Sequence, residues 1–242
     1  MTELPLLTGA ILTFAFFCQS LFGFGGGLIS IPILSLFMPV QDAVTLASIF
    51  QISMGFLITR TYKDTGWKHI RALLPTTVIG VLIGILLLKY LNGDLIRLAL
   101  AGYILLHLAR THTKFDPLGK IIKAGGAHLA GFLGGTLNAM IGGGGPAFIL
   151  YLKDKAKNSS EFRANITAIL FLSNIPRLAG TLGTGLMTWD IVTTAVMIYP
   201  FYLCVLALGQ KLHKKIPQKK FFVAIEILLA FTALSLTLKV LY

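Results

Sequence analysis

The chain has 242 residues, of which 55% are hydrophobic and only 12% charged, and its mean hydropathy is +0.81. A composition this apolar is typical of polytopic membrane proteins and excludes a water-soluble domain built around one core. With 21 Lys and Arg against 9 Asp and Glu, the formal net charge is +12, which by itself would also fit a nucleic-acid-binding protein.

Eight apolar stretches approach the length of about 20 residues that a helix needs to cross a bilayer. In chain order they are Leu4–Phe22, Val44–Arg60, Ala72–Tyr90, Leu95–Ala109, Gly125–Ile141, Phe162–Thr181, Ile191–Gly209 and Phe221–Leu241. Two shorter runs, Leu28–Met38 and Pro146–Leu152, each follow a cluster of glycines. We therefore predict an all-α polytopic membrane bundle of eight long spans and two short helices that span partway or re-enter. The first stretch lacks a charged leader and a cleavage site, so we expect it to be retained.

The positions of the basic residues explain the high net charge. Seventeen of the 21 Lys and Arg fall within four connections, at 60–71, 110–123, 153–163 and 211–220. Such segregation is the positive-inside pattern of a protein that crosses a membrane several times. The charge thus indicates orientation in a lipid bilayer, with these connections in the cytoplasm, and we expect no nucleic-acid partner.

The two halves of the chain resemble each other. Gly25, Gly26 and Gly27 align with Gly143, Gly144 and Gly145 at an offset of 118, and residues 47–60 fall on residues 164–177 at an offset of 117. Each half contains five passes if the short ones are counted, and an odd number makes the second half enter from the opposite face. We predict a repeat at 1–110, a basic cytoplasmic linker at 111–124 and an inverted repeat at 125–242, an arrangement common in secondary transporters.

The glycine motifs also carry a resemblance to a known family. The first consists of Gly23, Gly25, Gly26 and Gly27 with Pro32 after it, and the second of Gly142–Gly145 with Pro146 directly following and no counterpart of Pro32. Paired motifs of this kind resemble the sulfite exporter TauE/SafE family of bacterial membrane proteins, over essentially the whole chain.

That resemblance implies a secondary transporter in the bacterial cytoplasmic (inner) membrane that moves sulfite, thiosulfate or an organosulfonate such as sulfoacetate by alternating access. It leaves the particular anion and the direction open. Uptake of a sulfur oxyanion is the alternative within transport, and a non-transporting membrane subunit of a sulfur-metabolising assembly is the alternative outside it.

Consecutive glycines at membrane depth predict a break in the helix next to a ligand site. Glycine accepts positive φ and lets a ligand approach the backbone, and the first amides of the following helix form a natural anion seat. We therefore predict that Gly25, Gly26, Gly27, Gly143, Gly144 and Gly145 line the substrate site. The alternative is close helix packing, as we expect for the Gly80/Gly84 and Gly131/Gly135 pairs.

Neutral polar side chains within the spans form a second set of candidates: Gln19, Ser20, Ser48, Gln51, Thr136, Asn138, Asn165 and Asn174. Each is costly in a bilayer unless it finds a partner or faces a cavity. Ser20 pairs with Asn138, and Ser48 with Asn165, across the two halves. We predict that these four residues and Gln51 bind substrate oxygens; the alternative is that they join helices.

Two ionisable residues lie within apolar stretches. Arg177 follows Pro176 and would attract an anion, although it could instead reach the lipid headgroups. Its counterpart Arg60 falls in a cytoplasmic connection, where we expect it to fix topology. Glu226 is a candidate for proton coupling, with a plain ion pair near the basic end of its span as the alternative we favour.

We expect neither a cofactor, a metal nor an enzymatic activity. The five histidines show no ligand spacing, and no His-Glu-x-x-His, Gly-x-Ser-x-Gly or nucleotide-binding glycine motif occurs. Cys18 and Cys204 both lie in apolar stretches, so we predict no disulfide. The expected partners are a small anion, the bilayer and, for a bundle this small, a second copy of the chain in a homodimer.

Overall fold

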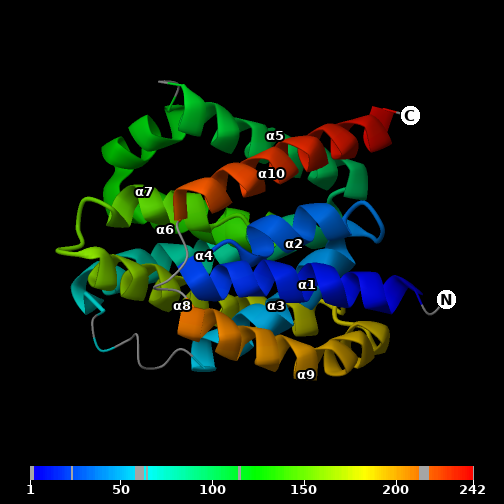
Figure 1. Ribbon diagram of the computed structural model, residues 1–242. Helices are drawn as coiled ribbons and strands as arrows, with labels where there is room; N and C mark the ends of the chain where they lie inside the picture. The colour runs from blue at the N-terminus through cyan, green and yellow to red at the C-terminus, as the bar shows by residue number, and fades with distance from the viewer. Residues whose placement is uncertain are drawn as a thin grey trace.

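The computed structural model describes residues 3–22, 24–57, 63, 65–113, 116–212 and 218–241, and every long element within these ranges is an α-helix (Figure 1). The helices are α1 (Glu3–Phe22), α2 (Gly26–Leu34), α3 (Val40–Leu57), α4 (Trp67–Tyr90), α5 (Gly93–His112), α6 (Pro117–Ile141), α7 (Gly145–Leu152), α8 (Ser159–Gly183), α9 (Trp189–Leu212) and α10 (Gln218–Leu241). The predicted all-α architecture is confirmed, including the two short helices that follow the glycine clusters.

The largest difference between a predicted and an observed helix boundary lies at the start of α6. Helix α6 begins at Pro117, within the segment predicted as a linker, because the Asp116 side chain accepts a hydrogen bond from the Gly119 amide and so caps the helix start. The helix is interrupted at Gly126, whose φ of 59° and ψ of −143° are not helical. The predicted start at Gly125 therefore corresponds to a kink rather than to a helix end.

Helix packing follows the two-fold pattern expected of a duplicated chain. Helix α1 packs on α9, and its counterpart α6 packs on α4; α2 packs on α3, and α7 packs on α8. The pairs α3–α8 and α5–α10 each join a helix to its own counterpart. Replacing each helix by the one five places away reproduces these contacts, although the α2–α10 contact has no comparable α5–α7 counterpart. The repeat and its inversion remain predictions.

The α4–α6 interface consists of two glycine pairs in close contact. A Cβ atom on Gly80 would lie 2.2 Å from the Phe132 carbonyl oxygen, and one on Gly135 would lie 2.3 Å from the Thr77 carbonyl oxygen. Gly84 and Gly131 are equally crowded by the backbone of the facing helix. The predicted packing role of these four glycines is confirmed, and the contact fixes α6, whose end carries the second glycine motif.

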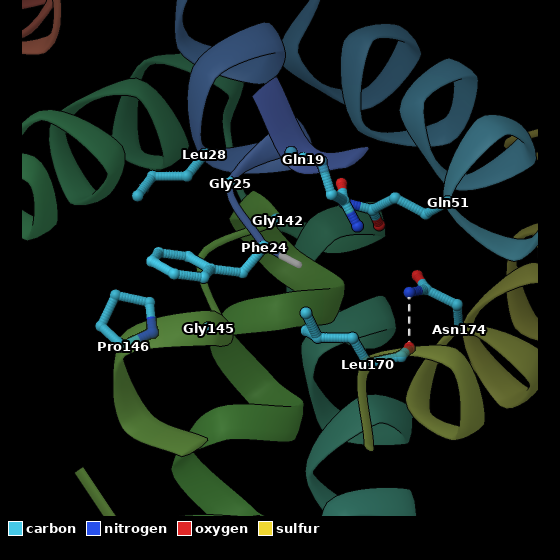
Figure 2. A pocket seen from close by; sticks show the side chains of 11 residues that line it. Gln19, Phe24, Gly25, Leu28, Gln51, Gly142, Gly145, Pro146, Leu170 and Asn174 are labelled. Carbon is cyan, nitrogen blue, oxygen red and sulfur yellow. Dashed lines mark hydrogen bonds between the residues drawn. The ribbon is translucent and has the colours of Figure 1, made fainter. Parts of the chain in front are cut away.

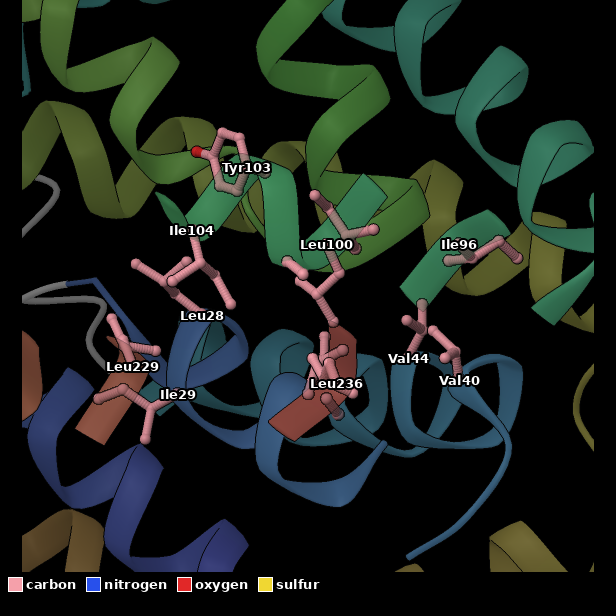
Figure 3. Close-up of a cluster of buried hydrophobic side chains, with 14 of the residues drawn as sticks. Leu28, Ile29, Val40, Val44, Ile96, Leu100, Tyr103, Ile104, Leu229 and Leu236 are labelled. Carbon is pink, nitrogen blue, oxygen red and sulfur yellow. The ribbon is translucent and has the colours of Figure 1, made fainter. Parts of the chain in front are cut away.

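A buried apolar cluster joins the first glycine hairpin to the outer helices (Figure 3). Leu28 of α2, Val44 of α3, Leu100 and Ile104 of α5 and Leu236 of α10 all belong to it and are largely or fully buried. This cluster holds the start of α2 against α5 and α10, so the first motif is anchored on the side away from α9.

Three of the described helices contain segments long and apolar enough to cross a membrane: Trp67–Tyr90, Ser160–Gly183 and Trp189–Gly209. Many large apolar side chains face outward, among them Val196, Met197 and Phe201 of α9, as suits contact with lipid. The helix ends that flank the four basic connections lie at the left of the bundle in Figure 1, opposite the start of α1 and the end of α10. This arrangement agrees with a common cytoplasmic face for those connections.

Candidate functional site

The first glycine motif reverses the chain between α1 and α2. Gly25 is the N-cap of α2 and has a φ of +105°, a conformation that favours glycine. The Gly26 amide donates a hydrogen bond of 3.0 Å to Oε1 of Gln19, which lies on the last turn of α1. A glutamine side chain thus caps the start of the short helix, a role in which an external anion oxygen could replace it.

The second glycine motif makes the corresponding reversal between α6 and α7 in a different way. Its left-handed residue is Gly142, with a φ of +67°, whose amide bonds to the Asn138 carbonyl and ends α6. Gly144 is the N-cap of α7 and has helical angles. The Tyr103 hydroxyl of α5 donates a hydrogen bond to the Gly143 carbonyl, so this motif is held from outside its own hairpin.

The two motifs meet each other inside the bundle. A Cβ atom on Gly27 would lie 3.0 Å from the Gly142 carbonyl oxygen, and a Cβ atom on Gly142 would lie 3.3 Å from the Gly27 Cα atom. The two backbones are therefore in van der Waals contact, which side chains at these positions would prevent. Two glycines that are 115 residues apart in the sequence thus lie against each other in the fold.

A small pocket lies where the motifs meet, and we call it the glycine pocket (Figure 2). Its lining residues are Gln19, Phe24, Gly25, Gly27, Leu28, Gln51, Gly142, Gly145, Pro146, Leu170 and Asn174. The polar atoms come from the carboxamides of Gln19, Gln51 and Asn174 and from the glycine backbone. Its volume is about 10 Å³, room for about one water molecule in this conformation.

A fully buried arginine stands behind this pocket. Arg177 of α8 is 0% exposed, and its Nη1 donates to Oε1 of Gln51 at 2.6 Å and to Oδ1 of Asn174 at 3.2 Å. Nη2 donates to the Val44 carbonyl at 3.1 Å, while Nε is buried without a hydrogen-bond partner. No carboxylate of the described residues lies within 4.0 Å of the guanidinium.

An unpaired buried cation is unusual because removing an ion from water costs several kcal/mol unless an opposite charge compensates. The acceptors around Arg177 are neutral amide oxygens, which satisfy hydrogen bonds but supply no negative charge. Two of them, on Gln51 and Asn174, belong to residues that also line the glycine pocket. The positive charge thus lies behind the pocket wall, separated from the pocket by these two carboxamides.

Four of the predicted site residues line the glycine pocket: Gly25, Gly27, Gly145 and Gln51. Gly26 lies directly beside it, with its amide on Gln19. Gly143 and Gly144 shape the second hairpin instead, and a Cβ on Gly144 would lie 2.5 Å from the Gly134 carbonyl oxygen. Arg177 is buried, so the alternative that it reaches the lipid headgroups is wrong.

The four residues predicted as matched pairs are not among those that line the glycine pocket. The Ser20 hydroxyl donates to the Phe17 carbonyl and Ser48 to that of Thr45, each within its own helix. Asn138 donates from Nδ2 to the Ser173 hydroxyl at 3.0 Å, and Asn165 accepts from the Gly66 amide at 2.7 Å. Only the two asparagines join different segments, as the alternative interpretation expects, and Oδ1 of Asn138 and Nδ2 of Asn165 are buried without a hydrogen-bond partner among the described residues.

Sequence reasoning singled out Gln19 and Asn174 only as polar groups at membrane depth, yet both line the pocket. Phe24, Leu170 and Pro146 were not proposed as ligands, and nothing in their type distinguishes them from ordinary apolar residues. Glu226 lies on α10 in a neighbouring cavity rather than in the glycine pocket. Arg60 lies outside the described residues.

The described part of the chain contains no group of three or more His, Cys, Asp or Glu side chains placed to hold a metal ion. Cys18 is buried and Cys204 is exposed, and both are free thiols. The chemistry that the glycine pocket offers is thus hydrogen bonding from amides combined with one buried positive charge.

Comparisons with known proteins place the chain among membrane transporters. The model of the family described as "Sulfite exporter TauE/SafE" matches residues 8–236. The "Probable inner membrane transporter protein TsaS" of Comamonas testosteroni is 26% identical over 180 residues, which cover 73% of this chain and 74% of that protein. A comparison with solved structures finds no match.

Proposed function

Because the chain belongs to the sulfite exporter TauE/SafE family of membrane transporters, we propose that it carries small sulfur-containing anions through the glycine pocket by alternating access. The substrates would be sulfite, thiosulfate or an organosulfonate such as sulfoacetate. The protein would act in the bacterial cytoplasmic membrane. The TsaS relative is named as an inner membrane transporter, which supports the inner membrane as the location of this chain.

The observation that carries this proposal is the buried Arg177 guanidinium, whose described neighbours supply no carboxylate. A sulfite or sulfonate group has three oxygens that accept hydrogen bonds and at least one negative charge. It would complete both the electrostatics of Arg177 and the hydrogen bonding of the amides at the start of α2.

In this proposal two glutamines take the place of the substrate when the pocket is closed. Oε1 of Gln19 accepts from the Gly26 amide, and Oε1 of Gln51 accepts from Arg177. Rotating both side chains frees a backbone donor and a charged donor on facing sides of one small space. Substrate oxygens would then replace the two carboxamide oxygens as acceptors for the Gly26 amide and Nη1 of Arg177.

Efflux of an anion needs no coupled ion under this scheme. An interior negative by 100 mV drives each negative charge outward with about 2.3 kcal/mol. The same transporter would take up anions if the concentration gradient exceeded this term, so direction follows from gradients. Proton coupling through Glu226 remains a prediction that a pH gradient tests.

The direct test is counterflow in proteoliposomes loaded with sulfite, thiosulfate or sulfoacetate, with acetate and malonate as carboxylate controls. The proposal expects exchange of the sulfur anions at rates at least tenfold above the carboxylates, and loss of exchange in Arg177→Gln. The matched control Arg97→Gln removes a surface arginine whose ion pair with Asp94 lies on α5. Equal rates for carboxylates, or an unaffected Arg177→Gln, would reject the proposed site.

A further inference from the structure

A second and larger cavity adjoins the glycine pocket, and we call it the vestibule. It encloses about 220 Å³. Its lining residues are Cys18, Phe24, Gly25, Leu28, Ile29, His107, Arg110, Thr111, Pro146, Ile149, Glu226 and Leu229. Four of these, Phe24, Gly25, Leu28 and Pro146, also line the glycine pocket, so the two spaces share a wall.

The shared wall is apolar. In Figure 2 the Phe24 ring lies between Leu28 and Pro146 and points away from the carboxamides of Gln51 and Asn174. Phe24 directly precedes the left-handed Gly25, at which the chain turns into α2. Phe24 thus stands between a polar pocket and the vestibule, and a ligand passing from one to the other must displace it.

The wall of the vestibule includes ionisable side chains. His107 and Arg110 lie one turn apart on α5, and Nδ1 of His107 and Nη1 of Arg110 are buried without a hydrogen-bond partner among the described residues. The Nε of Arg110 lies 4.0 Å from the Asp116 carboxylate. Glu226 of α10 also lines the vestibule and lies close enough to His107 to interact with it electrostatically.

The remainder of the vestibule is apolar and comes from several helices. Cys18 of α1, Leu28 and Ile29 of α2, Ile149 of α7 and Leu229 of α10 form its sides. A bare oxyanion would leave most of this space unused. The combination of buried side-chain nitrogens and aliphatic walls in one cavity suits an anion with an apolar tail of several carbon atoms.

We propose that the vestibule is a second ligand site, which binds organosulfonates with the sulfonate at Arg110 and His107 and the tail against Leu28, Ile29 and Leu229. This rests on the proposed function and refines its substrate class toward sulfonates with an apolar part. Glu226 competes with the sulfonate for the same donors. The vestibule selects such anions before they pass Phe24 into the glycine pocket.

Chain length gives the first test, by calorimetric titration of the full chain in lipid nanodiscs with sulfite and with methane-, propane- and butanesulfonate. Each added methylene should tighten binding about fourfold, since burying one contributes about 0.8 kcal/mol. In Ile149→Trp, which fills the vestibule, this increase should vanish while sulfite binding stays unchanged. A flat series in the unmodified protein would overturn the proposal.

Charge gives the second test, which also serves if Ile149→Trp fails to fold. Arg110→Gln should weaken butanesulfonate binding about tenfold, the value of a charge-assisted hydrogen bond, and Glu226→Gln should tighten it. The control Arg97→Gln, on the same helix, should change nothing. A butanesulfonate affinity that is unchanged in both Arg110→Gln and Glu226→Gln would overturn the vestibule proposal.

The two proposals fail in different ways. If Arg177→Gln abolishes sulfite binding while the vestibule variants leave butanesulfonate unaffected, the glycine pocket stands and the vestibule proposal falls. If Arg177→Gln binds every anion as the unmodified protein does, the proposed function falls instead. An unmodified protein that binds none of these anions would overturn both.

Discussion

Replacing Arg177 by glutamine separates a ligand-binding role from a structural one. The change removes the buried charge but keeps a carboxamide that can donate to the acceptors on Gln51 and Asn174. Because no described carboxylate loses a partner, we expect the folded protein to tolerate the loss of this cation. The melting temperature should stay within a few degrees of the unmodified value or rise.

Anion binding should respond far more strongly. Nη1 of Arg177 lies 2.6 Å from Oε1 of Gln51, so an anion oxygen that replaces this amide oxygen brings the two charges to about 4 Å. At an effective dielectric constant of about 20, their attraction is about 4 kcal/mol, which is about a thousandfold in Kd. If the Gln51 side chain stays between the anion and the guanidinium, the two charges are about 7 Å apart. Their attraction is then about 2 kcal/mol, which is about thirtyfold in Kd.

The assay is titration of sulfite into the unmodified protein and the Arg177→Gln variant, with a melting curve recorded for each. Arg163→Gln is the matched control, since Arg163 lies on the same helix and donates to the Ser20 carbonyl at 2.7 Å without lining the glycine pocket. We expect its sulfite affinity to be unchanged. A sulfite affinity in Arg177→Gln within threefold of the unmodified protein would refute the reasoning.

Three further substitutions test the surroundings of Arg177 and the contact between the two motifs. Gly27→Ala places a Cβ atom 3.0 Å from the Gly142 carbonyl oxygen and 2.4 Å from Nε2 of Gln51, so transport should fall at least tenfold. Gly102→Ala is the control, because its new Cβ atom would have no neighbour within 4 Å, and it should transport normally. Gln51→Glu supplies a carboxylate to Arg177, so the melting temperature should rise while sulfite binding is lost; binding that survives would contradict the substrate's place beside Arg177. Tyr103→Phe removes the hydroxyl that holds the second motif, which should cost about 1 kcal/mol of stability, measured by denaturant titration, and an unchanged stability would show that this bond contributes nothing.

The sequence predicts most of the fold because the membrane restricts the choices. Apolar stretches in a bilayer must satisfy their backbone internally and so become helices, and the ten runs found by hydropathy correspond to α1–α10. The start of α6 was harder to place. Asp116 and Pro117 begin a helix by local capping, and the hydropathy pattern registers only the kink at Gly126.

The site was only partly predictable, and the repeat explains why. Matched polar pairs such as Ser20 with Asn138 attracted attention because they recur in both halves, yet their side chains bond within the fold. The carboxamides in the pocket are not duplicated: at the alignment offsets, Gln19 falls on Leu137 and Gln51 on Ala168. A small asymmetric anion needs donors at one point, and internal symmetry does not reveal where single polar residues converge.

The central claim is that the anion binds between the two glycine motifs beside Arg177. Selenite, a sulfite analogue whose selenium scatters anomalously, tests it most directly in crystals of the unmodified protein. The account predicts an anomalous peak in the glycine pocket, beside the contact of Gly27 with Gly142, with Gln51 rotated away from Arg177 and the guanidinium about 4 Å from the selenium. A peak found only at the protein surface would contradict the central claim. So would crystals soaked in saturating selenite that show no peak in the pocket and an intact Gln51–Arg177 hydrogen bond.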